Sequence, residues 1–552
     1  MSRAALCLIT FAFLSPSLVA GQAITIHVNA DAKLGPWRPI WRYFGYDEPN
    51  YTSMRYGKQL LAELAALSSE PVYIRAHNLL TSGNGAPALK WGSTNAYTED
   101  AAGRPIYDWT ILDRIFDAYR DAGVKPFVEI GFMPQALSLH PEPYQHNWPK
   151  GPLGTGWSYP PKDYGKWAEL VYQWVRHTVE RYGRNEVDAW YWEVWNEPDI
   201  FYWHGTPEEY LKLYDFTADA VKRALPTARI GGPATTSPSA TRAADYLRQF
   251  LEHCNTGKNY ATGSTGCTLD FVTYHAKGRV SVVDQHVRMD IAKQTADVQK
   301  GIEIVSAFPK FRNLPIVLSE SDPEGCAACS TRLHPENSYR NGPLYAAYTA
   351  AMLNNVVELA GQNGSHIEGM LTWAFEFEGQ PYFEGFRTLA TNGVDKPILN
   401  FFRMAGLLHG ERVKVSSSGY TPAEPSELGT ADVNALAVKS DHELSVMTWN
   451  YRGDDVAAPP AEVTVQLEGL PSTVTRALLT HYRIDRTHSN AYALWQQFGS
   501  PQNPTPEQYS ALIAAGQLQN LGSPRWVSVR QAKAEIHLEL PPQAVSLLQL
   551  SW

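Results

Sequence analysis

The chain has 552 residues, which is too many for one ordinary domain and predicts a large domain with at least one smaller one. Apolar residues make up 44% of it and charged residues 19%, a composition typical of a soluble globular protein with a substantial core. The formal net charge of −9 argues against a nucleic acid or an anionic membrane as the partner.

The N-terminus has the pattern of a secretory signal peptide. Arg3 precedes an apolar run over 4–14, and small residues that suit cleavage follow between Ala20 and Ala23. A membrane anchor is the alternative, but the apolar run is too short to span a bilayer. We therefore expect residues 1–22 to be a cleaved signal and the mature protein to be secreted or periplasmic.

Four cysteines remain once the predicted signal is removed: Cys254, Cys267, Cys326 and Cys329. An even number in an oxidising compartment predicts two disulfides, for which three connectivities exist. Short loops favour Cys254–Cys267 and Cys326–Cys329. A four-cysteine zinc site is the competing interpretation, but exported proteins usually oxidise such pairs.

A short strand is expected over 24–28, ahead of the first regular alternation of strands and helices. From about residue 41, apolar strands then alternate eight times with amphipathic helices, one of them long and predicted over 284–308. This order and size predict a (β/α)8 TIM barrel over 41–396. An open doubly wound sheet is the alternative, but no glycine-rich phosphate loop follows the first strand.

The pattern changes from about residue 397. Short alternating strands separated by Gly, Pro, Ser and Asp turns are typical of a β-sandwich, which we expect over 397–552. The N-terminal segment 23–40 is expected to add its strand to that sandwich.

The fourth predicted barrel strand is the most informative stretch of the chain. A run of aromatic and β-branched residues from 188 ends at Pro198, which cannot donate a backbone hydrogen bond. Asn196 and Glu197 lie at this end, where a barrel places its reactive groups. Alone, the pair would be better explained as a cap of the following helix.

Other predicted strands also end in groups that could bind or attack a sugar, namely His77, His275, Glu320 and Trp373. Alternation along the seventh strand places Ile316, Leu318 and Glu320 on one face, so that an apolar face ends in a carboxylate. Because all parallel strands end at one rim, Glu197 and Glu320 should converge there. Paired carboxylates across a cleft are what glycosidic bond cleavage requires, whereas Glu320 alone could be a surface acid. The 17 tryptophans and 29 tyrosines fit either a core or a sugar-binding cleft.

The Trp195–Pro198 stretch (Trp-Asn-Glu-Pro) resembles the acid/base motif of the clan A retaining glycoside hydrolases. Within that clan, the chain resembles glycoside hydrolase family 39, the β-xylosidase family. The stretches that carry this resemblance are 45–51, 75–77, 129–134, 195–198, 383–386 and 392–400. The resemblance covers about residues 40–405 and implies a TIM barrel followed by a β-sandwich.

The resemblance also implies roles for individual residues. Glu197 would be the acid/base and Glu320 the nucleophile. The implied substrate-binding residues are Asn196, which would donate to the sugar 2-hydroxyl, Arg75, which would orient the nucleophile, and His77, His275, Glu378, Phe132 and Trp373.

Two segments depart from the family pattern. Glu320 is followed by Ser321-Asp322, where the family often has Trp-Asn. The sixth strand ends in His275-Ala276-Lys277, where the family often has His-x-Tyr, so a tyrosine that would touch the nucleophile is absent from its expected place.

The sequence therefore predicts a retaining exo-glycosidase, a β-xylosidase that acts on xylo-oligosaccharides in xylan degradation. The alternatives are an α-L-arabinosidase, a β-galactosidase or β-glucosidase, an iduronidase-like enzyme and a non-catalytic sugar-binding protein. No cofactor or metal is implied, no nucleic-acid or membrane partner is expected, and the sequence leaves the oligomeric state open.

Overall fold

The computed structural model describes residues 23–146, 153–420 and 430–552. The predicted signal peptide, residues 1–22, lies outside these described residues. Within the described ranges, no helix is long and apolar enough to cross a membrane.

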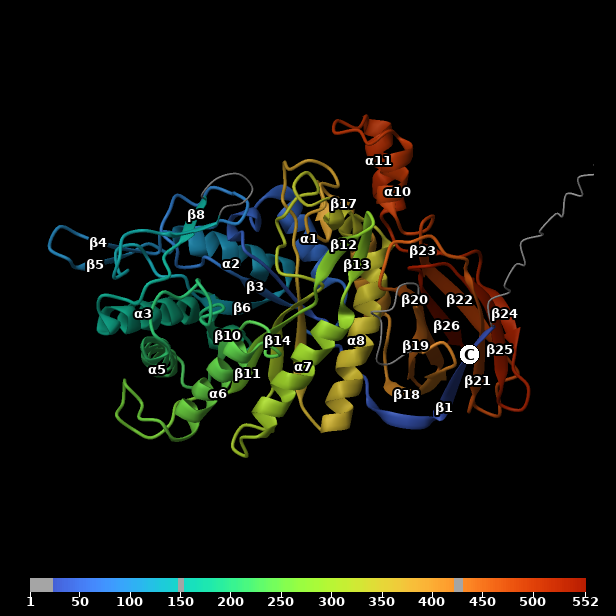
Figure 1. Cartoon of the computed structure of the whole chain (residues 1–552), viewed down its shortest axis with the longest axis horizontal. Coiled ribbons are helices and arrows are strands. Elements are labelled where there is room, and N and C mark those ends of the chain that lie inside the picture. The colour runs from blue at the N-terminus through green and yellow to red at the C-terminus, as the bar shows by residue number, and fades with distance from the viewer. Residues whose placement is uncertain (1–22, 147–152, 421–429) are drawn as a thin grey trace, which may run out of the picture.

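Eight parallel strands close into a barrel, which confirms the predicted fold class (Figure 1). The eighth strand pairs with the first, so the sheet has no free edge. The strands in chain order are β2 (Tyr43–Tyr46), β3 (Tyr73–Ala76), β6 (Lys125–Ile130), β9 (Tyr191–Val194), β10 (Arg229–Thr235), β11 (Phe271–Lys277), β14 (Ile316–Asp322) and β15 (Ile367–Trp373).

Helices cover the outside of this barrel and follow its strands in turn. Their ends carry readable signals: Gly123, which follows α2, caps it with a left-handed φ of 87°, and α5 begins with a capping box between Thr206 and Glu209. The helices are α1 (Arg55–Ala65), α2 (Thr110–Ala122), α3 (Tyr164–Tyr182), α4 (Arg184–Val187), α5 (Pro207–Ala224), α6 (Thr241–Thr256), α7 (Ile291–Ser306), α8 (Pro343–Asn363) and α9 (Pro397–Gly406).

The barrel interior is layered because side chains alternate along each strand. The apolar layer contains Tyr43, Tyr73, Phe127, Tyr191, Phe271, Val317 and Leu371, one from each of seven strands. Two residues further along three of these strands come Arg75, Glu129 and Glu193, which are fully buried. A charged layer therefore lies directly on an aromatic one, toward the carboxyl ends of the strands.

One predicted helix is shorter than expected. The segment 284–308 was expected to be helical throughout, but a hairpin of β12 (Val280–Val283) and β13 (His286–Met289) precedes α7. Asp284 and Gln285 have φ values of 51° and 66°, and two left-handed residues in succession form a two-residue hairpin turn.

Further short elements lie in the loops of the barrel, and several of them follow its strands at the carboxyl rim. They are η1 (Pro49–Tyr51), β4 (Tyr97–Glu99), β5 (Pro105–Tyr107), β7 (Tyr144–His146), β8 (Leu153–Gly156), η2 (Pro335–Asn341), β16 (Ala390–Thr391) and β17 (Val394–Asp395).

A ten-stranded sheet forms the other half of the molecule (Figure 1). It curls so that strands from distant parts of it share one core, with Ile26, Val465 and Leu479 in contact with the same cluster. The first strand, β1, lies between β18 and β21. The strands are β1 (Ile24–Pro36), β18 (Glu411–Ser417), β19 (Ala431–Lys439), β20 (Glu443–Arg452), β21 (Ala461–Glu468), β22 (Arg476–Ile484), β23 (Gln519–Asn520), β24 (Arg525–Ser528), β25 (Ala534–Leu540) and β26 (Val545–Ser551).

The sheet also carries a helical hairpin of α10 (Ala491–Gln497) and α11 (Pro506–Ala515), in a region expected to contain only strands. Trp495 and Leu512 of this hairpin pack on Phe383 and Val394, which belong to the segment after β15. The hairpin therefore joins the sheet to the carboxyl rim of the barrel.

Two disulfides are present, Cys254–Cys267 and Cys326–Cys329, in the pairing that loop length favoured. The first joins the end of α6 to the segment before β11. The second closes a short loop after β14, close to the end of the strand that carries Glu320.

The close contact of α7 with β11 generates a prediction about stability. A Cβ on Gly301 would lie 2.1 Å from the ring of Tyr274. Gly301→Ala should lower the free energy of unfolding by about 1–3 kcal/mol, as overpacked cores do. Gly361→Ala on α8 is the matched control, because its Cβ would meet nothing within 4 Å. Urea unfolding of the two variants tests this, and equal stabilities would contradict the packing of α7 on Tyr274.

Candidate active site

A β-bulge directs Glu320 into the barrel. Along β11 and β14, Tyr274 pairs with Leu318, and the next pair is His275 with Glu320. Strand β14 thus advances two residues where β11 advances one, which leaves Ser319 as the extra residue. In a regular strand, Glu320 would face the helices together with Ile316 and Leu318, both of which lie in the core between barrel and helices. The alternation expected from the sequence was therefore wrong in detail, because the inward face of the regular part of β14 carries Val317.

The end of β9 is strained, and this positions Glu197. Trp195 has a backbone φ of 71° and Glu197 one of 44°, values that residues other than glycine rarely adopt. The Glu197 backbone N–H donates to the carbonyl of Ala234 at 2.9 Å, which ties this turn to β10. Ala234 itself has φ 53°. Such conformations persist only where the surrounding structure holds them, and they cluster at functional sites.

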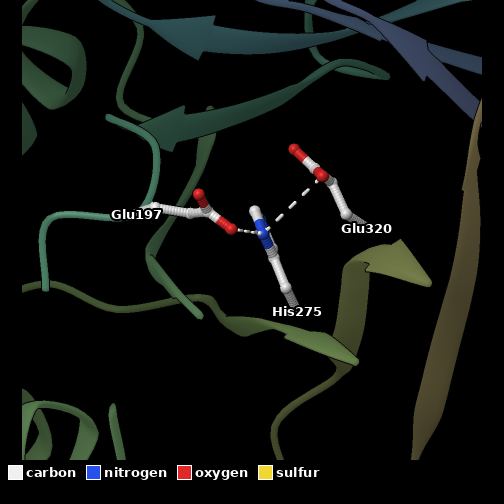
Figure 2. Close-up of side chains that lie close together, drawn as sticks. All are labelled: Glu197, His275 and Glu320. Atoms are coloured by element: carbon white, nitrogen blue, oxygen red, sulfur yellow. Dashed lines mark hydrogen bonds and ion pairs between the residues drawn. The ribbon is translucent and has the colours of Figure 1, made fainter. Parts of the chain in front are cut away.

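The two carboxylates meet at the carboxyl rim, with an imidazole between them (Figure 2). One oxygen of Glu197 and one of Glu320 lie within 4.8 Å of each other. His275 Nδ1 lies 2.9 Å from Glu197 Oε1 and 3.8 Å from Glu320 Oε2. The imidazole therefore lies between the two acids, with Nδ1 closer to Glu197. Its Nε2 has no hydrogen-bond partner among the described residues.

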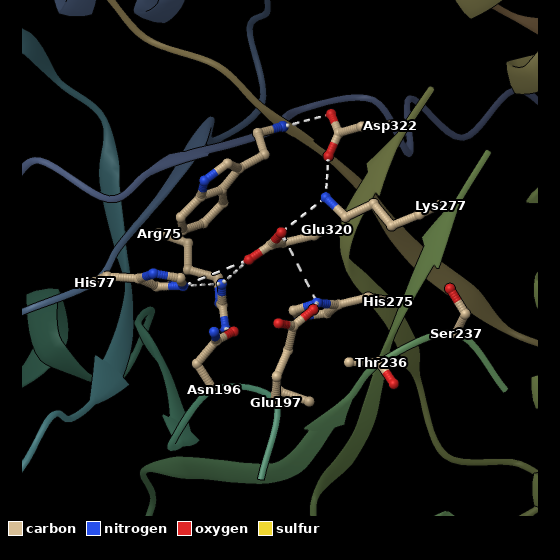
Figure 3. Close-up of polar contacts among 12 residues, drawn as sticks. Arg75, His77, Asn196, Glu197, Thr236, Ser237, His275, Lys277, Glu320 and Asp322 are labelled. Atoms are coloured by element: carbon tan, nitrogen blue, oxygen red, sulfur yellow. Dashed lines mark hydrogen bonds and ion pairs between the residues drawn. The ribbon is translucent and has the colours of Figure 1, made fainter. Parts of the chain in front are cut away.

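Three cationic groups gather around Glu320 (Figure 3). Lys277 Nζ lies 2.7 Å from Glu320 Oε2, whereas Arg75 Nη1 and His77 Nε2 lie 3.2 and 3.4 Å from Oε1. Burial alone would raise the pKa of Glu320. The charges of Lys277 and His275, the hydrogen bond from His77 and the charge of Arg75 outweigh burial and hold this pKa well below its usual range. Glu320 is therefore an anion at neutral pH.

Arg75 is the centre of the buried charged layer. Its Nε lies 2.6 Å from Glu193 and its Nη2 lies 3.0 Å from Glu129, with all three side chains inaccessible to solvent. Nη2 also donates to Asn196 Oδ1 at 3.1 Å. One guanidinium thus fixes Asn196 and Glu320 relative to each other. Glu193 is a paired core acid.

His77 is held as an imidazolium. Its Nδ1 lies 2.7 Å from Asp47 and its Nε2 lies 2.9 Å from Glu129. Burial would lower the pKa of His77, but the charge of Glu129 and hydrogen bonds to Asp47, Glu129 and Glu320 raise it well above its usual value. Asp47 also accepts from Lys90 at 2.5 Å. Burial and the nearby Asp47 raise the pKa of Glu48 to about 8, so Glu48 is largely protonated at neutral pH.

Asp322 positions Lys277. The two residues lie opposite each other on β14 and β11, and Lys277 Nζ lies 2.5 Å from Asp322 Oδ2. Asp322 Oδ1 accepts from the backbone N–H of Trp373 at 2.9 Å, and Arg387 lies 3.4 Å from Oδ2. The departures that the sequence showed at Lys277 and Asp322 are therefore two halves of one ion pair beside Glu320.

The remaining predicted binding residues differ in position. The ring of Trp373 lies 4.3 Å from the ring of His77 and 5.1 Å from the guanidinium carbon of Arg75. Phe132 has no exposed surface, and its ring centroid lies 5.8 Å from that of His77. Glu378 accepts from the backbone N–H of Tyr56 at 2.9 Å, at the start of α1. Within the described residues, its carboxylate forms no hydrogen bond or ion pair with Arg75, His77 or Glu320.

Sequence reasoning named no role for Tyr202 or Asp47. The ring of Tyr202 stacks on Phe132 at 5.8 Å, and burial followed by the charges of Asp47, Glu197 and Glu320 raises its pKa well above the usual value. Tyr202 therefore lies near both acids although it follows β9 by eight residues. The signal for Asp47 was its place directly after β2, where other strands carry reactive groups.

Glu197, His275 and Glu320 form a donor set that could surround a cation. Lys277 and Arg75 already bring two positive charges against Glu320, so a metal ion there would be repelled at close range.

Comparisons with known proteins agree with this geometry. The family model of the glycosyl hydrolases family 39 matches residues 24–531. A beta-xylosidase from Caldicellulosiruptor saccharolyticus is 28% identical over 446 residues, which cover 79% of this chain and 81% of the relative. An alpha-L-iduronidase from Mus musculus is 25% identical over 535 residues, which cover 90% of this chain and 76% of the relative. A crystal structure of a monomeric beta-xylosidase from Caulobacter crescentus superposes with a TM-score of 0.76 at 22% identity, over 96% of this chain and 99% of that one.

The buried ion pairs of Arg75 generate a prediction about stability. Arg75→Met would leave Glu193 buried without its counter-ion and would remove one of the two cations beside Glu129, so the free energy of unfolding should fall by about 3–5 kcal/mol. Arg176→Met is the matched control, because Arg176 forms an exposed pair with Glu180 that solvent screens, so its loss should change stability little. Denaturant unfolding at pH 7 compares the variants, and a similar small loss for both would show that the layer does not depend on Arg75.

Proposed function

The chain belongs to family 39 of the glycosyl hydrolases, as the sequence resemblance predicted, and we propose that it is a retaining exo-glycosidase that releases β-linked xylose from xylo-oligosaccharides. Membership of the family implies a carbohydrate substrate. The observation that carries the proposal is the closeness of Glu197 and Glu320, whose oxygens approach within 4.8 Å. Retaining enzymes keep their carboxyl groups about 5–5.5 Å apart, whereas inverting enzymes need about 6.5–9.5 Å to admit a water.

The proposed reaction is a double displacement. Glu320 attacks the anomeric carbon, the glycosidic C–O bond breaks, and Glu197 gives its proton to the departing oxygen. Glu197, now a carboxylate, then takes a proton from a water that attacks the glycosyl-enzyme ester. This releases the sugar and restores the Glu320 anion. The cations around Glu320 support the first role, because they keep the attacking group ionised.

His275 is suited to hold Glu197 through both steps. Its Nδ1 lies 2.9 Å from Glu197 Oε1, so it accepts from the protonated acid or donates to the carboxylate, depending on which group carries the proton. Asn196 presents its carbonyl to Arg75, which turns its NH2 group away from the guanidinium. That NH2 group is our candidate donor to the sugar 2-hydroxyl.

Lys277 favours a second candidate, an enzyme that releases a uronic acid, as an α-L-iduronidase does. A β-D-xyloside and an α-L-iduronide share their configuration from C1 to C4 and differ by a carboxylate on C5. Lys277 brings an ammonium group to the rim beside Glu320, where the family often has a tyrosine. An ammonium at this place could pair with a substrate carboxylate.

The roles of the two acids can be separated by substitution. Glu320→Ala removes the attacking group, so hydrolysis of even an activated aryl xyloside should fall on the order of 10⁵–10⁶-fold, the scale of losing a covalent nucleophile. Glu197→Ala removes general-acid assistance, so hydrolysis of xylobiose should fall by about 10²–10⁴-fold. Aryl xylosides should lose less in the first step, because a nitrophenolate leaves without a proton, and a burst of nitrophenol should precede slow turnover.

Azide provides the diagnostic readout for these variants. It should restore turnover of Glu197→Ala and give a β-glycosyl azide, because azide fits the vacated space and needs no deprotonation. Rescue of Glu320→Ala with an α-product identifies the nucleophile independently, whereas the opposite pattern would exchange the two roles. Glu303→Ala, an exposed acid on α7, serves as the control and should keep full activity. If Glu197→Ala and Glu320→Ala both matched wild type on every glycoside, the proposed catalytic site would be wrong.

A panel of nitrophenyl glycosides distinguishes the glycones. We expect the highest kcat/KM on the β-D-xyloside, ahead of the α-L-arabinoside, β-D-galactoside, β-D-glucoside and α-L-iduronide.

Lys277→Met should raise the pKa of Glu320, so the acid limb of the xyloside pH profile should move to higher pH, and Lys277→Arg should restore it. Preference for the iduronide, with a KM for it that Lys277→Met raises about tenfold or more, would replace xylose by the uronic acid. Activity on no glycoside would favour a non-catalytic sugar-binding protein.

A further inference from the structure

Trp526 stands exposed on the ten-stranded sheet. It lies on β24, opposite Leu478 of β22, and 56% of its surface is open to solvent. No other large apolar side chain of the described ranges has a higher exposed fraction. The guanidinium carbon of Arg476 lies 4.4 Å from its ring centroid, which holds the indole against the sheet. An exposed, fixed indole of this kind is a feature of ligand-binding surfaces.

This indole borders a groove of about 690 Å³, a size that suits a ligand. The groove lies where β24 approaches β21 and β25, at the end of the molecule away from the barrel (Figure 1). Its lining combines polar and apolar surface and includes Gln466 and Ser528 as well as the indole. An aromatic platform flanked by hydrogen-bonding side chains is the arrangement that binds a sugar ring, because a pyranose has both an apolar face and a rim of hydroxyls.

The charges of the groove differ from those of the chain as a whole. Arg525, Arg530 and Lys533 line it together with Glu468 and Glu535, so its formal charge is +1 (three positive minus two negative), whereas the chain carries −9. Lys533 pairs with Glu468 at 3.5 Å, and Glu535 lies 2.8 Å from His537. Arg525 and Arg530 form no ion pair with a described residue, so both guanidinium groups are available to an anion.

We propose that this groove is an auxiliary binding site for an acidic glycan chain. Sugar rings of the chain stack on Trp526, and its carboxylate or sulfate groups pair with Arg525 and Arg530. The site is separate from Glu197 and Glu320, so it binds a different part of the same polymer or a neighbouring chain. Holding a polymer there raises the local concentration of chain ends near the barrel without any change in the chemistry of cleavage.

Affinity electrophoresis and calorimetry with the full-length protein test this site. The probes are glucuronoxylan, which carries carboxylates, heparan sulfate, which also carries sulfates, and a neutral arabinoxylan. Trp526→Ala should weaken binding of at least one acidic glycan about tenfold, as the loss of a central aromatic contact does. Its kcat/KM on a small aryl glycoside and its melting temperature should match wild type. Tyr420→Ala is the control, because Tyr420 is also exposed on this half of the molecule and lies outside the groove.

A double variant tests the cationic part of the proposal. Arg525→Ala with Arg530→Ala should weaken binding of the acidic glycan and flatten its dependence on salt, because both guanidinium contacts are lost. Binding of glucuronoxylan would show that carboxylates are sufficient. Binding of heparan sulfate alone would show that sulfates are required. Equal affinity for neutral arabinoxylan, unchanged binding by Trp526→Ala, or binding that an active-site inhibitor abolishes would each overturn the proposal. A change of oligomeric state in Trp526→Ala, measured by light scattering, would assign the groove to contact between copies instead.

Discussion

The Arg75 guanidinium, buried inside the barrel with carboxylates around it, is the constraint on which the site depends. Removing a charge from water costs several kcal/mol per ion, so such a group persists only with close partners and well-formed hydrogen bonds. Glu193, Glu129 and Glu320 supply those partners at 2.6, 3.0 and 3.2 Å. Regular strands place Glu129 and Glu193, and the bulge in β14 places Glu320. The ion pairs of Arg75 therefore hold Asn196 and Glu320 in place at the carboxyl rim.

Regular strand periodicity places the rim residues of β3, whereas an interruption of that periodicity places the rim residue of β14. Along β3, regular alternation carries Tyr73, Arg75 and then His77 into the barrel interior. Along β14 the same alternation would turn Glu320 outward, and the extra residue Ser319 reverses this. At β9, left-handed backbone at Trp195 and Glu197 has a comparable effect. Local departures from regular structure are thus concentrated at the residues that would do chemistry.

The sequence was sufficient to predict the barrel and the convergence of its strand ends, because parallel strands all finish at one rim. It also predicted that Arg75, His77, Glu197, His275 and Glu320 belong together, and the structure brings them together, although their roles remain predictions. It did not reveal the bulge at Ser319, since an extra residue is visible only in the register between two strands. The same reason hid the pairing of Lys277 with Asp322. The α10–α11 hairpin left a readable signal in Pro506 and in the capping box of Thr505 with Gln508, but the many strands around it obscured that signal.

The surroundings of the two acids differ in a way that bears on both mechanism and substrate. Lys277, Arg75 and His77 crowd around Glu320, whereas Glu197 lies against His275 and has the more exposed side chain, 15% against 7%. A pair of carboxylates placed in such different fields is what separates an attacking anion from a proton donor. Lys277 in turn faces two carboxylates, Glu320 and Asp322, so its ammonium group is already paired on both sides. A substrate carboxylate would therefore have to compete with Glu320 and Asp322 for Lys277, whereas a neutral pentose makes no such demand.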